Sequence, residues 1–121
     1  MQKRILIIDD DEDSLHLLNL ALKRDGYIVF TSNSCGNIND IKAVSPDLVV
    51  LDININTSGE NGDVMCRKLK ENIRTQHLPV LLFSGALDLK ERFLRCGADG
   101  YLEKPFELNE LRFKVKAQLA G

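Results

Sequence analysis

Five polar residues lie at or just after the ends of short apolar runs, and their side chains suit phosphoryl chemistry: Asp9, Asp10, Asp52, Ser84 and Lys104. Clustered carboxylates repel one another and burial raises their pKa values, a difficulty that a divalent cation removes. Mg2+ binds a few carboxylates together with water and phosphate oxygens. A lysine and a hydroxyl can then contact the phosphoryl oxygens, and one carboxylate can act as the nucleophile and form an acyl phosphate. The residue types therefore predict a Mg2+-dependent phosphoryl site.

These side chains can meet only if the apolar runs are neighbouring strands. Continuous apolar runs cover Ile5–Ile8, Leu48–Leu51 and Val80–Phe83, and weaker ones cover Tyr27–Phe30 and Tyr101–Leu102. Short runs bounded by polar residues are typical of strands buried on both faces of a parallel sheet. Ligands of open α/β sheets bind beyond the carboxyl ends of the strands. The predicted strand ends would therefore gather the polar residues in one place.

Apolar residues at helical spacing lie between the predicted strands. The patterns are Leu15, Leu18 and Leu22; Ile38, Ile41 and Val44; Val64, Cys66, Leu69 and Ile73; Leu87, Phe93, Leu94 and Gly97; and Leu108, Leu111, Val115 and Leu119. Gly26 and Pro46 would end the first two helices. Regular alternation of strand and helix predicts an α/β fold with a doubly wound parallel sheet and right-handed crossovers.

Taken in order, these motifs resemble the receiver domain of two-component response regulators, of the chemotaxis-regulator type. The matching segments are ILIIDD with Asp9 and Asp10, DLVVLDI with Asp52, VLLFSG with Ser84, and GADGYLEKPF with Tyr101 and Lys104. Each motif is weak by itself, but their combination in this order is specific. The resemblance implies a flavodoxin-like (βα)5 sheet with strand order 2-1-3-4-5, and one receiver domain over residues 1–121.

The resemblance implies a metal site and a phosphoacceptor. Asp9 and Asp10 would help to hold Mg2+, Asp10 more directly. Asp52 would accept the phosphoryl group from a phosphohistidine and would also bind the metal. Asn54 would give its backbone carbonyl to the same ion.

The resemblance also implies a switch and partners. Ser84 and Lys104 would contact phosphoryl oxygens, and Tyr101 would move inward as Ser84 shifts toward the phosphate. The donor would be a sensor histidine kinase or a histidine phosphotransfer protein, and the target a downstream protein. The protein would be a monomer or a weak phosphorylation-dependent dimer, and it would be no enzyme beyond its own phosphotransfer and dephosphorylation.

Two loops depart from the family pattern. The family usually has methionine and proline where this sequence has Ile55–Asn56, and the best glycine match, Gly62, lies ten residues after Asp52. This loop is about two residues longer than usual and lacks a rigid proline, so we expect Asn56–Asn61 to affect partner choice or metal access. The segment Ser84–Lys104 is about two residues shorter than usual, which we expect to shorten or re-aim the fourth helix.

Three alternatives remain. The alternating oxygens from Asp52 to Asp63 suggest a calcium loop, but such loops need glycine at position six and glutamate at twelve, where Thr57 and Asp63 stand. A flavodoxin-like redox enzyme needs a phosphate-binding first loop, and the acidic segment DDDEDS would repel a flavin phosphate. A pseudo-receiver, which binds partners without phosphorylation, is less compatible with the complete set of acids, Ser84 and Lys104.

Composition narrows the function further. The net charge of −2 disfavours direct nucleic-acid binding, which uses a basic surface. No apolar run approaches the roughly 20 residues of a membrane span, and we expect a cytoplasmic protein. The three cysteines, Cys35, Cys66 and Cys96, have no metal-site spacing and are expected to be reduced packing residues. We interpret Asp11 and Asp13 as an N-cap and first-turn charge set of the first helix.

Overall fold

The computed structural model describes residues 2–53, 61–85 and 87–120. Strands and helices alternate along the chain: β1 (Arg4–Ile8), α1 (Glu12–Arg24), β2 (Ile28–Ser32), α2 (Ile38–Val44), β3 (Leu48–Asp52), α3 (Gly62–Glu71), β4 (Val80–Ser84), α4 (Leu89–Cys96), β5 (Gly100–Glu103) and α5 (Leu108–Leu119). The strands form one sheet in the order β2-β1-β3-β4-β5, and all neighbouring strands are parallel. The predicted fold class and strand order are confirmed.

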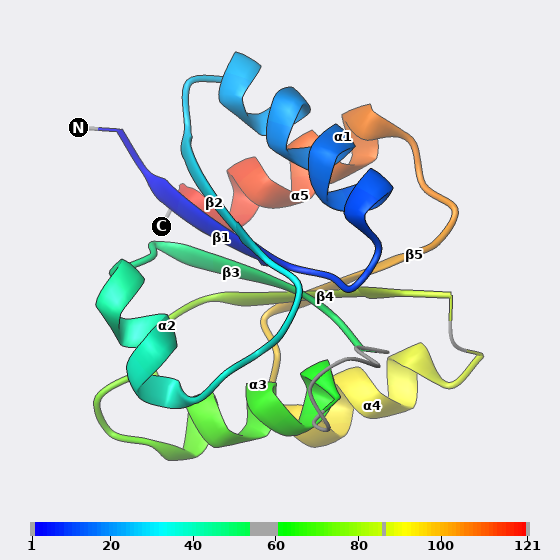
Figure 1. The fold of residues 1–121 in the computed structure, drawn as a ribbon. Helices are drawn as coiled ribbons and strands as arrows, with labels where there is room; N and C mark the ends of the chain where they lie inside the picture. The colour runs from blue at the N-terminus through cyan, green and yellow to red at the C-terminus, as the bar shows by residue number, and fades with distance from the viewer. Residues whose placement is uncertain (1, 54–60, 86, 121) are drawn as a thin grey trace.

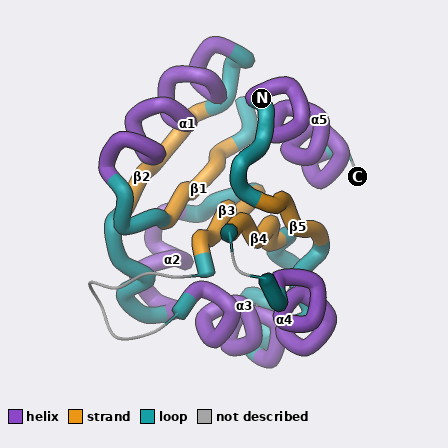
Figure 2. The backbone as a smooth tube through the Cα atoms, turned by 90° about the vertical axis from the view of Figure 1, so that its right-hand side faces the viewer, coloured by secondary structure: helices purple, strands orange, loops and turns teal. Residues whose placement is uncertain are grey.

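Helices cover both faces of the sheet. Helices α1 and α5 lie on one face, and α2, α3 and α4 lie on the other (Figures 1 and 2). The sheet separates two apolar clusters, one under each helical layer. The central strands β3 and β4 are buried along their whole length, which explains why they appear in the sequence as continuous apolar runs rather than alternating ones.

Strand register places the predicted site residues at the carboxyl ends of the strands. Ile8 of β1 pairs with Leu51 of β3, so Asp9 and Asp52 both lie one residue further on. Asp52 pairs in turn with Phe83 of β4. Parallel pairing aligns the carboxyl ends of neighbouring strands. The sheet itself therefore brings residues that are distant in sequence together, beyond the ends of these strands.

The helix ends follow their local sequence. Asp11 is the N-cap of α1, and its carboxylate accepts a hydrogen bond from the Asp13 backbone N–H, as the capping interpretation expected. Gly26, with φ of 91°, follows the end of α1. Ser45 ends α2 in the left-handed conformation just before Pro46. The two predicted stops therefore lie where the helices end.

Two helical patterns were partly wrong. In α3 the buried residues are Gly62, Met65, Cys66 and Leu69. Val64 is exposed, and Ile73, which is 81% exposed, follows the end of the helix. Residues 65, 66 and 69 share one helical face, and 64 does not lie on it. Residue 73 has the spacing of that face but follows the end of the helix, so it is not held against the sheet. Leu87, which is predicted to lie in the fourth helix, precedes α4 and is fully exposed.

The strand predicted at Tyr27–Phe30 begins one residue later and extends to Ser32.

Candidate functional site

Three aspartates meet beyond the ends of β1 and β3. Carboxylate oxygens of Asp9, Asp10 and Asp52 lie within 4.8 Å of one another. Asp9 is fully buried and Asp52 is 5% exposed, whereas Asp10 is half-buried. Asp9 is held through both its backbone and its side chain. Its backbone N–H donates to the Ser32 carbonyl oxygen at 3.1 Å, and its carboxylate accepts from the Asp11 N–H at 3.0 Å. Two of the three carboxylates are therefore withdrawn from solvent, and Asp9 is held in place by hydrogen bonds.

One lysine, the residue that follows β5, reaches into this cluster. The Lys104 backbone N–H donates to the Ser84 carbonyl oxygen at 2.9 Å, which continues the β4–β5 pairing past the strand end. Its Nζ lies 3.1 Å from an Asp52 oxygen and 3.4 Å from an Asp9 oxygen. The same ammonium lies 4.6 Å from the centre of the Phe83 ring. The ring limits where the ammonium can go, so the positive charge is held beside both buried carboxylates.

The cluster is electrostatically strained without further positive charge. Burial raises the pKa of Asp9 to about 6, and neighbouring Asp52 raises it too. The Asp11 N–H and the Lys104 ammonium lower it, but they do not offset burial. A buried carboxylate with a raised pKa is held in place by the fold at the expense of stability.

This donor set fits Mg2+. The ligand atoms are carboxylate oxygens, the hard donors that Mg2+ prefers, and they come from two strand ends rather than a closed protein cage. A divalent cation would also offset the burial and the Asp52 charge that together raise the Asp9 pKa. Asp9, Asp10 and Asp52 are the described residues that would hold it. The fourth predicted ligand, Asn54, lies outside the described residues.

Ser84 and Tyr101 lie on the strands beside the cluster. Ser84 ends β4, one residue beyond the strand partner of Asp52, and is 1% exposed. Tyr101 is half-buried on β5, and its ring centre lies 4.8 Å from that of Phe93 in α4. The Lys114 ammonium of α5 lies 5.7 Å from the Tyr101 ring centre. Tyr101 thus lies at the edge of the sheet where α4 meets β5.

Gly62 has a positioning role that sequence reasoning treated only as a loop-length marker. Its N–H donates to the Ile53 carbonyl oxygen at 2.9 Å. A Cβ atom built on Gly62 would overlap the backbone carbonyl oxygen of Asp52. Only glycine allows the start of α3 to lie this close to the candidate phosphoacceptor. Of the predicted loop Asn56–Asn61, only Asn61, the N-cap of α3, is within the described residues.

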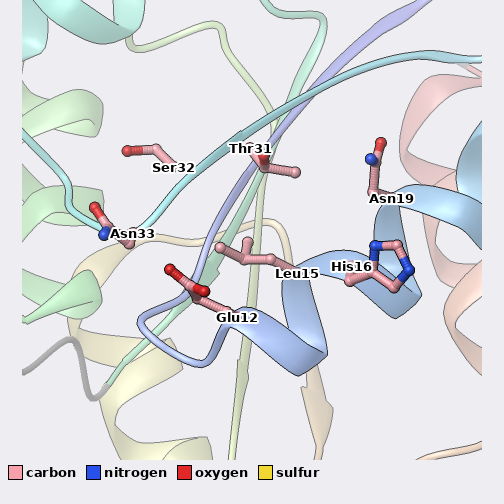
Figure 3. A pocket seen from close by; sticks show the side chains of 7 residues that line it. All are labelled: Glu12, Leu15, His16, Asn19, Thr31, Ser32 and Asn33. Atoms are coloured by element: carbon pink, nitrogen blue, oxygen red, sulfur yellow. The ribbon is translucent and has the colours of Figure 1, made fainter.

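A polar depression of about 580 Å³ lies beside the cluster, between α1 and the end of β2 (Figure 3). Its lining residues are Glu12, Leu15, His16, Asn19, Thr31, Ser32 and Asn33. None of the predicted site residues is among them. The depression therefore forms a neighbouring surface rather than part of the acidic centre.

None of the helices among the described residues has the length and apolar character of a membrane span.

Comparison with known proteins identifies the family. The model of the response regulator receiver domain matches residues 5–116. The heme response regulator HssR of Staphylococcus epidermidis is 34% identical over 117 residues, which cover 94% of this chain and 50% of HssR. The DNA-binding response regulator MtrA of Mycolicibacterium paratuberculosis is 30% identical over 122 residues, which cover 98% of this chain and 52% of MtrA.

A solved structure gives the same result for the fold. The CheY-like receiver domain protein of Methanospirillum hungatei superposes with a TM-score of 0.82 and 25% identity, covering 99% of this chain and 95% of that one. The chain spans about half the length of the curated relatives it matches. Five of the predicted site residues lie together at the strand ends in the described structure. This chain belongs to the response regulator receiver domain family of two-component signalling.

Proposed function

We propose that this domain accepts a phosphoryl group from a phosphohistidine onto Asp52 and thereby switches a protein-binding surface. The observation that carries the proposal is the position of the Asp52 carboxylate. It lies within the acidic cluster and 3.1 Å from the Lys104 ammonium. A nucleophile, a metal-binding set and a fixed cation are thus adjacent, as phosphoryl transfer requires.

The proposed reaction is an in-line displacement at phosphorus. An oxygen of Asp52 attacks the phosphorus, the phosphorus–nitrogen bond to the donor imidazole breaks, and an aspartyl phosphate forms. Lys104, now paired with the carboxylates, exchanges part of that pairing for a phosphoryl oxygen. The Ser84 hydroxyl donates to another phosphoryl oxygen. Because the transition state is loose, this positioning supplies most of the rate enhancement.

The chemistry requires a divalent cation held by Asp9, Asp10 and Asp52, for which Mg2+ fits the oxygen donors. When bound, Mg2+ neutralises the negative charge that builds up on the transferring group. Asp9 contributes through its rigid attachment, since its carboxylate and backbone are both hydrogen-bonded. We include the Asn54 carbonyl as a further ligand on the basis of the family resemblance.

The proposed switch runs from Ser84 to Tyr101 and α4. A new dianionic group at Asp52 draws the Ser84 hydroxyl toward it. Movement at the end of β4 changes the space next to Tyr101, which packs on Phe93 of α4. The surface formed by α4, β5 and α5 would then present a different face to a target protein. We place this cycle in the cytoplasm, in a monomer or a weak phosphorylation-dependent dimer.

The proposed partners are a sensor histidine kinase or a histidine phosphotransfer protein and a downstream protein. The curated relatives include a regulator described as DNA-binding, MtrA, of which this chain matches about half. The 121-residue chain has a net charge of −2, so we assign it no direct contact with nucleic acid.

The test is Mg2+-dependent labelling. Incubation with acetyl phosphate and Mg2+ should add one phosphoryl group, about 80 Da, and borohydride trapping with peptide mapping should place it at Asp52. Asp52→Asn should remove the label, whereas Asp13→Asn, an exposed acid in the first turn of α1, should keep it. Labelling of Asp52→Asn at the parental rate would refute the assignment. Absence of both labelling and Mg2+-dependent beryllofluoride binding would favour a pseudo-receiver.

A further inference from the structure

Two buried cysteines face each other across the α3–α4 interface, away from the acidic cluster. Cys66 lies in α3 and is fully buried, and Cys96 is the last residue of α4 and is 3% exposed. These helices pack side by side on the same face of the sheet (Figures 1 and 2). Residues 30 positions apart in sequence are therefore brought into contact by the fold.

The two thiols interact directly. The Cys66 thiol lies 3.6 Å from the Cys96 carbonyl oxygen, and it also donates toward the Cys96 sulfur. The Cys96 sulfur lies 3.6 Å from the Phe93 carbonyl oxygen of the same helix. A disulfide requires the two Cβ atoms to come within about 4.5 Å of each other, and the contact between the thiols already brings the two side chains together.

The two sulfurs have different roles: Cys96 attacks the oxidant, and Cys66 then completes the disulfide. The hydrogen bond from Cys66 and the backbone N–H of Ala98 lower the pKa of Cys96 to about 7, although burial opposes them. The pKa of Cys66 is raised by the same contact with Cys96 and by burial. Because the thiolate is the reactive form, Cys96 reacts first and Cys66 keeps its proton for the second step.

The position of Cys96 at a helix end offers a route for small oxidants. Cys96 ends an eight-residue helix, and the next residue, Gly97, is exposed and has φ of 79°. The ends of short helices open by local fraying at little free-energy cost. Hydrogen peroxide is close to water in size, so brief opening of this terminus is enough to admit it.

We propose that Cys66 and Cys96 form a redox-modification site, at which hydrogen peroxide produces a disulfide that ties α4 to α3. The Cys96 thiolate attacks one peroxide oxygen, and the O–O bond breaks. Hydroxide departs, and Cys96 becomes a sulfenic acid. The Cys66 sulfur then attacks the sulfenic sulfur, the S–O bond breaks, and the leaving oxygen takes the Cys66 proton and departs as water. Two thiols are oxidised, and one peroxide is reduced to two water molecules.

The cross-link would restrain the helix that carries Phe93. Phe93 lies three residues before Cys96 and packs on Tyr101. A covalent tie at Cys96 limits how far this part of α4 can move from α3. The redox site does not depend on phosphorylation of Asp52, so it can be tested by itself.

The experiment oxidises the folded protein with hydrogen peroxide, blocks remaining thiols by alkylation, and maps peptides without reduction. The titratable thiols should fall from three to one, with the Cys66 and Cys96 peptides linked and the chain lighter by about 2 Da. The Tm of the oxidised protein should rise by about 5–10 °C and return to its original value with dithiothreitol.

Cys35→Ser is the matched control, because Cys35 is buried to the same 3% as Cys96 and its replacement should leave the cross-link intact. Cys66→Ser and Cys96→Ser should each abolish it. Peptide mapping of the unmutated chain keeps the test valid if a variant fails to fold. A disulfide that includes Cys35, a link between two chains, a sulfinic acid at Cys96 without a link, or three unreacted thiols in the folded protein would each overturn the proposal.

Discussion

Replacing Asp9 with asparagine should stabilise the metal-free protein at neutral pH. Asp9 is fully buried and its pKa of about 6 exceeds the ordinary value of 3.8, chiefly because of burial. Asparagine keeps the oxygen that accepts from the Asp11 N–H but carries no charge. One pKa unit corresponds to about 1.4 kcal/mol, so the substitution should raise the free energy of unfolding by up to about 3 kcal/mol at pH 7.5.

The gain should depend on pH in a defined direction. The folded protein binds the Asp9 proton more tightly than the unfolded chain, because the folded pKa is raised. The cost of the charged carboxylate is therefore fully present above pH 6, falls as the pH drops through 6, and is absent below 3.8. The advantage of Asp9→Asn should shrink in the same window.

Urea unfolding in EDTA at a series of pH values measures this difference. Asp13→Asn, which changes an exposed acid in the first turn of α1, controls for the change in net charge and should shift stability by no more than about 0.5 kcal/mol. Mg2+ should stabilise the parent protein more than the Asp9→Asn variant, since the variant lacks one ligand. Destabilisation of Asp9→Asn by the same amount at pH 7.5 and pH 4.5 would refute the reasoning.

Three further substitutions test the surroundings of the site. Gly62→Ala should lower the free energy of unfolding by about 2–4 kcal/mol and reduce phosphoryl labelling, because its Cβ would overlap the Asp52 carbonyl oxygen; unchanged urea unfolding would contradict this. Lys104→Met should slow labelling by acetyl phosphate at least about tenfold while the protein still binds Mg2+; a parental labelling rate would show that the ammonium is dispensable. Phe93→Ala should cost about 1–2 kcal/mol through the lost Tyr101 contact and leave the Asp52 labelling rate unchanged.

The sheet and the acidic centre were predictable because both depend on local sequence signals. Strands β1, β3 and β4 are buried on both faces and therefore appear as unbroken apolar runs. Parallel pairing then aligns the ends of those strands, so residues that follow them must approach one another. Asp9, Asp10 and Asp52 are thus expected to lie together, and the structure brings their oxygens within 4.8 Å of one another.

Contacts between helices were not predictable in this way. In α3, the apolar Val64 faces solvent while Met65 is buried, because the packing direction of a short helix is set by its neighbours rather than by its composition. The close approach of Gly62 to Asp52 depends on where α3 begins, and no local signal gives that position. The Cys66–Cys96 contact likewise requires the placement of α4 against α3.

Helix α4 connects the proposed phosphoryl site with the proposed redox site. Only Leu89 and Cys96 are buried along it, and Arg92 adds a long ion pair of 3.9 Å to Asp63 of α3. A helix with few anchors can shift at low cost, which suits a surface that responds to phosphorylation. A disulfide at Cys96 would add a covalent anchor at its C-terminal end, while the end of β4 at Ser84 acts near its N-terminal end. Oxidation and phosphorylation would then act on the same helix from opposite ends, so the oxidised protein should show a smaller change around Phe93 on beryllofluoride binding than the reduced protein.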